Sequence, residues 1–199
     1  MLKSNALVIF VKNARRGHVK TRLATSLGDD KALAIYLALC ERIRNVCFGF
    51  SGKCYVYYSE YIPLEPDLWE DDFFIKRKQD PITDLGLRMK AAFNELLPFH
   101  SSVILIGTDI PHLTTDVLEE SILFLKNTDV VLGPSDDGGY YLIGMKKPND
   151  YLFQNMTWSV DTVSSETIQR ISMNNTTYSL LKTLPDIDIA EDWEKHGWF

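Results

Sequence analysis

The sequence predicts an α/β fold, a three-layer α/β/α sandwich around a mixed, mostly parallel central sheet. Short apolar, β-branched runs alternate with segments of helical periodicity along the whole chain. That alternation is typical of a parallel sheet covered on both faces by helices. One pair of apolar runs is separated only by a tight Gly-Gly turn, which is too short for a helical crossover. This turn predicts one antiparallel pairing and therefore a mixed sheet.

In the first half of the chain, a buried strand is expected over Ala6–Val11 (ALVIFV), because its apolar run is unbroken. A helix over Lys31–Cys47 follows, with apolar residues at helical spacing and Asp29 or Asp30 as its N-cap. The remaining elements of this half are two strands and an amphipathic helix, over Lys53–Ser59, Phe73–Lys76 and Ile82–Leu97.

In the second half, Val103–Gly107 (VILIG) is another buried strand, and a helix begins near Thr114 or Thr115. The strands on either side of the Gly-Gly turn are Asp129–Leu132 and Tyr140–Gly144. The chain is expected to end with a helix, a strand and a short helix, over Thr162–Met173, Tyr178–Thr183 and Ala190–Lys195.

Length and composition favour one domain spanning residues 1–199, since no linker, repeat or low-complexity tract divides the chain. Apolar residues make up 45% and charged residues 24%, the usual mix of a globular protein. No apolar stretch approaches the ~20 residues that cross a bilayer, and no secretory signal is recognisable. The odd set of Cys40, Cys47 and Cys54 has no zinc-type spacing, which predicts buried free thiols. A cytoplasmic protein without a transmembrane segment is expected.

Charge is concentrated in one segment. The formal net charge is −6, yet Lys12–Arg22 (KNARRGHVKTR) contains only cations among its charged residues. On an acidic protein, a short basic segment favours a local anion site over a nucleic-acid surface, which needs a broad basic face. A solvated basic loop is the alternative. The segment directly follows the first strand, where ligands bind in open α/β sheets.

The basic segment is therefore a candidate nucleotide-binding loop. Arginine presents a planar fork to phosphate oxygens and lysine presents a point charge, which together suit a diphosphate. Neither a Walker P-loop nor a G-x-G-x-x-G fingerprint is present. The candidate phosphate ligands are Lys12, Arg15, Arg16, Lys20 and Arg22.

A second candidate position is Gly107–Leu113 (GTDIPHL), after the strand at Val103–Gly107. Asp109, followed by the rigid Pro111, is a candidate ligand for Mg²⁺ or Mn²⁺, ions held by one or two carboxylates together with substrate phosphates. Thr108 is a candidate nucleotide contact. An Asp that only stabilises a turn is the alternative.

A third position is the Gly-Gly turn, Pro134–Gly144 (PSDDGGYYLIG). Gly138 and Gly139 allow close approach of a ligand, and Asp137 is a candidate to orient or deprotonate an acceptor hydroxyl. An ordinary hairpin turn is the alternative. Further candidate acceptor-binding residues are Tyr140, Trp158 and Ser159.

Two further segments carry candidates. Asp188 in the segment Asp186–Trp193 (DIDIAEDW) is a second candidate metal ligand, although Asp188 and Glu191 also match the spacing of a capping box. The helix beginning near Asp84 is expected to present Gly86 and Arg88 to the nucleotide, or else to be an ordinary amphipathic helix. No G-x-S-x-G elbow and no H-x-x-x-H pair is present.

Together these motifs resemble a family of small bacterial glycosyltransferase-like proteins with the GT-A, nucleotide-diphospho-sugar transferase fold. The family is related to molybdenum-cofactor and phospholactate guanylyltransferases. The matching stretches are FVKNARRGHVKTRL, TDLGLRMKAAF, VILIGTDIPHLT, VVLGPSDDGGYYLIG, Trp158-Ser159 and LPDIDIAEDW. The resemblance implies a basic loop that holds the nucleotide through Lys20 and Arg22, and metal ligation by Asp109 and Asp188.

Three departures from the related families bear on the activity. The basic loop contains only Gly17, whereas sugar-nucleotide pyrophosphorylases have a glycine-rich loop, so that activity is disfavoured. Thr83 stands where a Gly-Asp-Leu-Gly pattern has its first glycine. Asp109 belongs to Thr-Asp-Ile and not to the Asp-x-Asp of many GT-A glycosyltransferases.

The leading expectation is a Mg²⁺- or Mn²⁺-dependent transferase that moves a glycosyl group from a nucleotide-diphosphate sugar to a small acceptor. Asp137 would act on the acceptor, and Lys20 would stabilise the phosphates. A nucleotidyltransferase acting from an NTP on a small phosphorylated acceptor is the first alternative, and a non-catalytic nucleotide-binding protein is the second. No nucleic-acid partner is expected. The sequence leaves the sugar, the base, the acceptor and the oligomeric state open.

Overall fold

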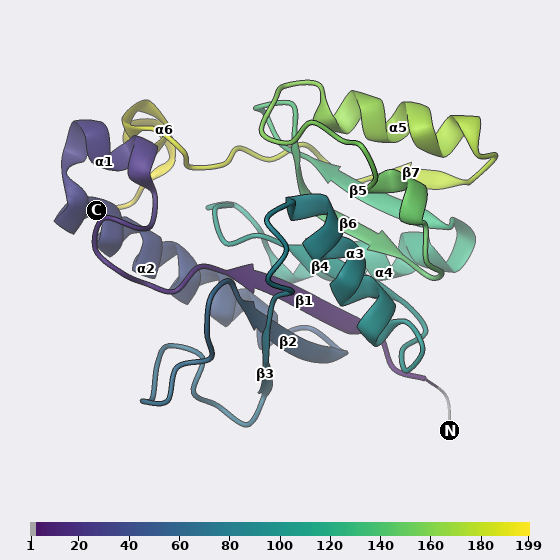
Figure 1. The fold of residues 1–199 in the computed structure, drawn as a ribbon, viewed down its shortest axis with the longest axis horizontal. Helices are drawn as coiled ribbons and strands as arrows, with labels where there is room; N and C mark the ends of the chain where they lie inside the picture. Colours follow the sequence, from purple (N-terminus) through teal and green to yellow (C-terminus); the bar gives the residue numbers. More distant parts are fainter. Residues whose placement is uncertain (1–2) are drawn as a thin grey trace.

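The computed structural model describes residues 3–199, which form a seven-stranded sheet between two layers of helices (Figure 1). The strand order is β3-β2-β1-β4-β6-β5-β7. Among the strands of the described residues, β6 alone runs antiparallel to its neighbours, β4 and β5, and the other pairings are parallel. The strands are β1 (Ala6–Val11), β2 (Lys53–Tyr58), β3 (Phe74–Lys78), β4 (Val103–Ile106), β5 (Val130–Pro134), β6 (Tyr140–Met145) and β7 (Tyr178–Leu180).

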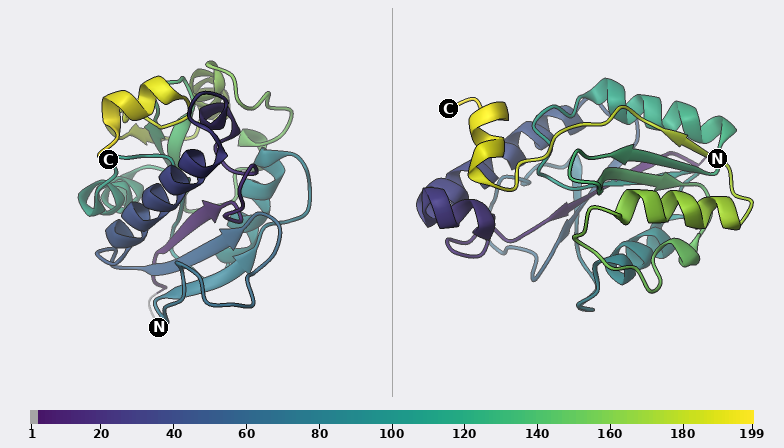
Figure 2. Two further views of the ribbon diagram at one scale, coloured as in Figure 1. Left: turned by 90° about the vertical axis from the view of Figure 1, so that its left-hand side faces the viewer. Right: turned by 90° about the horizontal axis from the view of Figure 1, so that it is seen from above.

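Helices cover both faces of this sheet, which confirms the predicted α/β/α sandwich (Figure 2). The alternation of side chains along β1 shows how: Leu7 and Ile9 pack on the face covered by α2 and α4, and Val8 packs on the face covered by α3 and α5. The helices are α1 (Thr21–Leu27), α2 (Asp29–Cys47), α3 (Leu85–Leu96), α4 (Thr115–Asn127), the short 3₁₀ helix η1 (Asp150–Leu152), α5 (Val163–Met173) and α6 (Ala190–His196).

A smaller apolar cluster joins the two ends of the chain. Leu23 of α1 and Trp193 of α6 pack with Leu39 of α2, all of them buried. The C-terminal helix therefore lies against the N-terminal helices, as the turned views also show (Figure 2). This contact brings the last segment of the chain to the loop that follows β1.

The predicted strands and main helices are present, with differences at their ends. The antiparallel pair at the Gly-Gly turn is confirmed, and β6 also pairs with β4. The basic segment does not remain a loop to its end, because α1 begins at Thr21. Gly28, not Asp29 or Asp30, is the N-cap of α2, and both acids lie in the first helical turn, where they suit the helix dipole.

The capping box predicted for Asp188 and Glu191 was wrong, because other residues cap the last helix. Ile189 is the N-cap of α6, and the carboxylate of Asp192 accepts hydrogen bonds from the backbone N–H groups of Asp188 and Ile189. The carboxylate of Asp188 is therefore not used in the cap.

Cys40, Cys47 and Cys54 are buried free thiols, as predicted. Within residues 3–199, no helix has both the length and the apolar character that crossing a membrane requires.

The topology gathers the chemistry-bearing loops at one edge of the sheet. The parallel strands β1, β2, β3 and β4 all end there, and β5 ends there too. Because β6 runs the opposite way, its first residue, Tyr140, lies at the same edge as the end of β5. Ligands of open α/β sheets bind beyond such an edge.

Candidate active site

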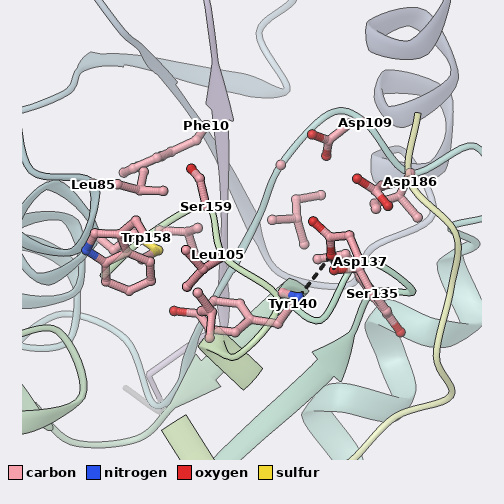
Figure 3. A pocket seen from close by; sticks show the side chains of 18 residues that line it. Phe10, Leu85, Leu105, Asp109, Ser135, Asp137, Tyr140, Trp158, Ser159 and Asp186 are labelled. Atoms are coloured by element: carbon pink, nitrogen blue, oxygen red, sulfur yellow. Dashed lines mark hydrogen bonds between the residues drawn. The ribbon is translucent and has the colours of Figure 1, made fainter. Parts of the chain in front are cut away.

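Two adjoining cavities open at this edge. The first, which we call the basic cleft, has a volume of about 610 Å³ and is lined by four cationic side chains, Lys12, Lys20, Arg22 and Arg88. The second, the apolar pocket, has a volume of about 230 Å³ and extends between β4, β6 and the start of α3. Both cavities are lined by the same three carboxylates, Asp109, Asp137 and Asp186, which therefore lie where the two cavities meet. Figure 3 shows these carboxylates together on one side of the apolar pocket.

Lys20 is the most tightly held cation of the basic cleft. Its side chain is only 9% exposed, and its ammonium group donates to the backbone carbonyl of Ile187 and lies 3.5 Å from Oδ2 of Asp109. Its backbone is left-handed (φ 47°), an uncommon conformation for a residue with a side chain, and α1 begins immediately after it. The ammonium group is therefore fixed beside the carboxylates by contacts with two distant segments.

The remaining cations of the basic segment differ in where they point. Arg22 lines the basic cleft and forms a 2.6 Å ion pair with Asp188. Arg15 is paired with Glu60 at 2.8 Å, and Arg16 is paired with Asp30 at 2.6 Å. Neither Arg15 nor Arg16 is among the residues that line the basic cleft. The structure therefore brings Lys12, Lys20 and Arg22 together and leaves the two central arginines outside.

The loop after β4 positions Asp109. Its backbone carbonyl accepts a hydrogen bond from the N–H of Ile187 at 2.9 Å, which ties this loop to the C-terminal segment. A Cβ atom on Gly107 would lie 2.9 Å from Oδ1 of Asp109, so the glycine leaves room for the carboxylate to fold back over the strand end. Thr108 is buried beside it and lines the basic cleft.

Asp186 lines both cavities, and the sequence reasoning did not select it. Burial, followed by the negative charges of Asp137 and Asp109, raises the pKa of Asp186 to about 7, while Lys20 acts in the opposite direction. A signal was present in the sequence. In an extended segment, alternate residues point the same way, and Ile187 is fully buried, so Asp186 and Asp188 both point away from the core.

Asp137 belongs to the turn between β5 and β6. Its Oδ1 accepts hydrogen bonds from the hydroxyl of Ser135 and, at 2.9 Å, from the backbone N–H of Gly139. Within residues 3–199 no donor reaches Oδ2. Asp137 is thus both a turn residue and a carboxylate with one oxygen available at the cavity boundary.

The two glycines of this turn have different surroundings. Gly138 has φ 86°, and a Cβ atom there would clash with the backbone of Asp161, so this glycine lets the turn pack against the segment before α5. Gly138 does not line the apolar pocket, whereas Gly139 does. The expected open approach therefore exists at one of the two positions.

Aromatic side chains form one end of the apolar pocket, opposite the three carboxylates (Figure 3). The rings of Tyr140 and Trp158 meet edge to face with centroids 6.4 Å apart. A Cβ atom on Gly86 would clash with the indole of Trp158, so Gly86 supports this wall and is not among the residues lining the basic cleft. The Tyr140 hydroxyl and the Trp158 Nε1–H are buried and have no hydrogen-bond partner within residues 3–199.

Gln79, which follows β3, is a second lining residue that the sequence reasoning missed. It is 5% exposed, and its amide nitrogen donates to the carbonyl of Tyr57 at 2.9 Å and to that of Val11 at 3.4 Å. Both amide hydrogens are therefore used by the protein, and the amide plane is fixed at the wall of the basic cleft. No motif marked this position, because its partners are backbone carbonyls of other strands.

The basic cleft contains the oxygen ligands that Mg²⁺ and Mn²⁺ prefer. Carboxylates of Asp109, Asp186 and Asp188 line it. Within residues 3–199 no group of three or more His, Cys, Asp or Glu side chains is arranged closely enough to hold a metal ion without other ligands. Such ions are commonly held by one or two carboxylates together with substrate phosphates, so the chemistry of these side chains fits a metal that arrives with a nucleotide.

The fold and the position of the cavities define a class, because the architecture is the nucleotide-diphospho-sugar transferase fold. A crystal structure of a candidate nucleotide-diphospho-sugar transferase from Desulfovibrio desulfuricans G20 is 27% identical, with a TM-score of 0.84 over 94% of this chain and 84% of the other. A nucleotidyl transferase from Methanothermobacter thermautotrophicus is 11% identical, with a TM-score of 0.69 over 96% and 95% of the two chains. The inositol-1-phosphate CTP transferase of T. maritima is 14% identical, with a TM-score of 0.59 over 96% and 92%.

Residues 56–160 match the family model described as "Uncharacterized protein conserved in bacteria (DUF2064)", and the chain belongs to this family. No curated protein matches the sequence. The resemblance to the GT-A superfamily is confirmed by the fold and by these similarities.

Proposed function

We propose that the protein is a metal-dependent transferase that moves a glycosyl group from a nucleotide-diphosphate sugar to a small acceptor. The observation that carries this proposal is the row of carboxylates, Asp109, Asp137 and Asp186, between a cleft lined by cations and a pocket lined by apolar side chains. Such a boundary separates an anionic donor from a less polar acceptor. The similarity to the Desulfovibrio protein supports the same class of reaction.

The basic cleft would hold the donor. Lys20 is buried beside Asp109, and a charge in a partly desolvated site interacts more strongly with phosphate than a charge in water. Arg15 and Arg16 have no part in this proposal, because acids outside the cleft hold them. The residues that would contact the nucleotide diphosphate are Lys12, Lys20, Arg22, Arg88 and Thr108.

Asp109 and Asp188 would hold Mg²⁺ or Mn²⁺ together with the phosphates. When bound, the ion would neutralise the charge that develops on the leaving diphosphate. Asp188 is paired with Arg22 at 2.6 Å in this structure, so both of these side chains would exchange a protein partner for the donor or its metal.

Asp137 would act on the acceptor through its available oxygen. That oxygen would take the proton of the acceptor hydroxyl as the hydroxyl oxygen forms a bond to the anomeric carbon. The bond between the anomeric carbon and the diphosphate oxygen breaks, and its electron pair leaves with the nucleoside diphosphate. The three buried free thiols suit a reducing compartment such as the cytoplasm.

Nucleotidyl transfer is the second candidate function, and a specific observation favours it. Two of the solved structures with this fold, from Methanothermobacter and T. maritima, are named for nucleotidyl or CTP transfer. In that reaction an acceptor oxygen attacks the α-phosphate of an NTP, and pyrophosphate leaves with the electron pair of the broken bond. Lys20 would stabilise the same phosphates.

Product analysis separates these functions. The protein is incubated with a panel of nucleotide-diphosphate sugars and NTPs, with Mg²⁺ or Mn²⁺ and mixed acceptors, and the release of nucleoside diphosphate or pyrophosphate is measured. Release of nucleoside diphosphate that is lost in Lys20→Met and Asp137→Asn, and kept in the exposed control Arg16→Met, supports glycosyl transfer. Pyrophosphate release supports the second candidate. Nucleotide binding without either product would identify a non-catalytic binding protein.

A further inference from the structure

The apolar pocket differs from the basic cleft in its charges. Its lining includes Asp109, Asp137 and Asp186, and no lysine, arginine or histidine of residues 3–199. All four cations near the site line the basic cleft, on the other side of these carboxylates. The nearest of them, Lys20, is already bound to Asp109 and to the carbonyl of Ile187.

This charge distribution bears on what the pocket can hold. An anionic group in it would lie beside carboxylates with no cation in the lining to compensate, and like charges at short range repel strongly where water is scarce. A metal ion at Asp109 would not change this balance, because the phosphates of the donor would use its charge. An uncharged or positively charged group meets no such penalty.

The walls of the pocket favour an apolar group. Phe10, Leu85 and Met89 line it on the side of β1 and α3, and Tyr140 and Trp158 close its far end (Figure 3). Burying apolar surface against these side chains is favourable. A volume of about 230 Å³ is at the small end for a ligand pocket, so it suits one ring or a short chain.

We propose that the apolar pocket binds the acceptor, and that this acceptor is an uncharged or cationic small molecule with a hydroxyl at one end and an apolar ring or short chain at the other. The inference rests on the proposed transferase function. The hydroxyl lies at the carboxylate boundary, where its proton passes to Asp137 as its oxygen bonds to the anomeric carbon and the diphosphate leaves with the electron pair. The apolar group lies against Tyr140 and Trp158. A phosphorylated or carboxylated acceptor does not fit.

Three probes that share a phenylethyl group and differ in the charge of their polar end test this inference without any turnover. They are 2-phenylethanol, 2-phenylethylamine and 2-phenylethyl phosphate, which are neutral, cationic and anionic at pH 7.5. Their dissociation constants are measured by NMR titration in the absence of nucleotide. We expect the neutral and cationic probes to compete for one site and the phosphate to bind at least about tenfold more weakly, the factor that a single modest like-charge repulsion produces.

A variant that adds a positive charge at a partly exposed position of the pocket tests the role of charge without destabilising the fold. Leu85 lines both the apolar pocket and the basic cleft and is 41% exposed at the first position of α3, so Leu85→Lys adds a cation where the two cavities meet without opening the core. It is expected to remove most of the discrimination against the phosphate probe. The matched control is Leu123→Lys on α4, a 54% exposed leucine that is not part of the pocket, which should leave all three constants unchanged.

Two results would overturn the inference. One is a phosphate probe that binds the wild type as tightly as the neutral probe and is displaced by it. The other is the absence of binding by all three probes. The binding test and the product assay fail separately: selective binding without turnover would contradict the transferase, whereas turnover with a phosphorylated acceptor would contradict only the acceptor class.

Discussion

The carboxyl group of Asp186 gives a quantitative prediction about the stability of the fold. Burial and the charges of Asp137 and Asp109 raise its pKa to about 7 from the ordinary value of 3.8. The folded protein therefore binds a proton more readily than the unfolded chain between these two values. Stability falls as the pH rises through this window, because the folded state must either retain the proton or bear the buried charge. Above pH 7 the cost is complete.

Replacing Asp186 by Asn removes this cost. One pKa unit corresponds to about 1.4 kcal/mol, so a shift of about three units sets an upper value of about 4 kcal/mol for the gain in the free energy of unfolding at pH 8. Partial exposure of the side chain to solvent lowers the gain, to about 1–3 kcal/mol. Below pH 4 the variant and the wild type should be equally stable, since the carboxyl group is then protonated in both folded and unfolded states.

Urea denaturation at pH 4, 6 and 8, in the presence of EDTA, measures the difference directly. Asp188→Asn is the matched control, since its carboxylate is exposed and paired with Arg22, and its effect should be small. The reasoning fails if Asp186→Asn is no more stable than the wild type at pH 8, or if its effect is the same at all three pH values. Either result would mean that the three carboxylates do not share a desolvated boundary.

Four further outcomes are expected. Lys20→Met should weaken the binding of nucleoside diphosphates by about ten- to a hundredfold in calorimetry, because a charge-assisted hydrogen bond contributes about 1.5–3 kcal/mol. Unchanged binding would contradict the assignment of the basic cleft as the nucleotide site. Tyr140→Phe should leave the thermal midpoint unchanged or raise it, since the hydroxyl is buried without a partner in residues 3–199. A destabilised variant would reveal a partner of the hydroxyl. Loss of turnover in a stable variant would indicate that the hydroxyl contacts the substrate. Gly86→Ala should cost about 1–3 kcal/mol in urea denaturation, because its methyl group would meet the indole of Trp158, and a neutral effect would show that the indole can move. Burial lowers the pKa of His100 below 6.5. The contribution of its neutral imidazole to stability is therefore present above pH 6.5 and is lost as the pH falls. His100→Gln should flatten this pH dependence in a series of thermal midpoints.

The sheet could be predicted from the sequence because the central strands are buried on both faces. An unbroken apolar run such as Ala6–Val11 is typical of a strand buried on both faces of a sheet. The short Gly-Gly turn required an antiparallel pair of strands. The same topology rule located Lys20, Asp109 and Asp137, each of which follows a strand or precedes one at the same edge. These predictions depended on local patterns, which a single sequence contains.

Long-range contacts explain what the sequence did not reveal. Arg15 and Arg16 were indistinguishable from Lys20 by composition, and only their pairing with Glu60 and Asp30 removes them from the cleft. Asp186 was not selected from the sequence, because the charges that raise its pKa come from Asp137 and Asp109 in two other loops. The helix α1 has a mostly polar sequence of seven residues, and its packing against α6 supplies the apolar contact that its own pattern lacks.

The insertion of β6 between β4 and β5 affects the order in which the molecule can be assembled. During synthesis β5 emerges before β6, yet in the finished sheet it has no pairing with β4. Until the ribosome has released residues 140–145, the edge of β4 remains open to incorrect partners, including the newly made β5 or another nascent chain. Only when β6 enters do the loop carrying Asp109 and the turn carrying Asp137 take up their positions on either side of it. The candidate site is therefore among the last parts of the molecule to form, and a chain arrested before this strand would expose the unpaired edge of β4 and lack the candidate site.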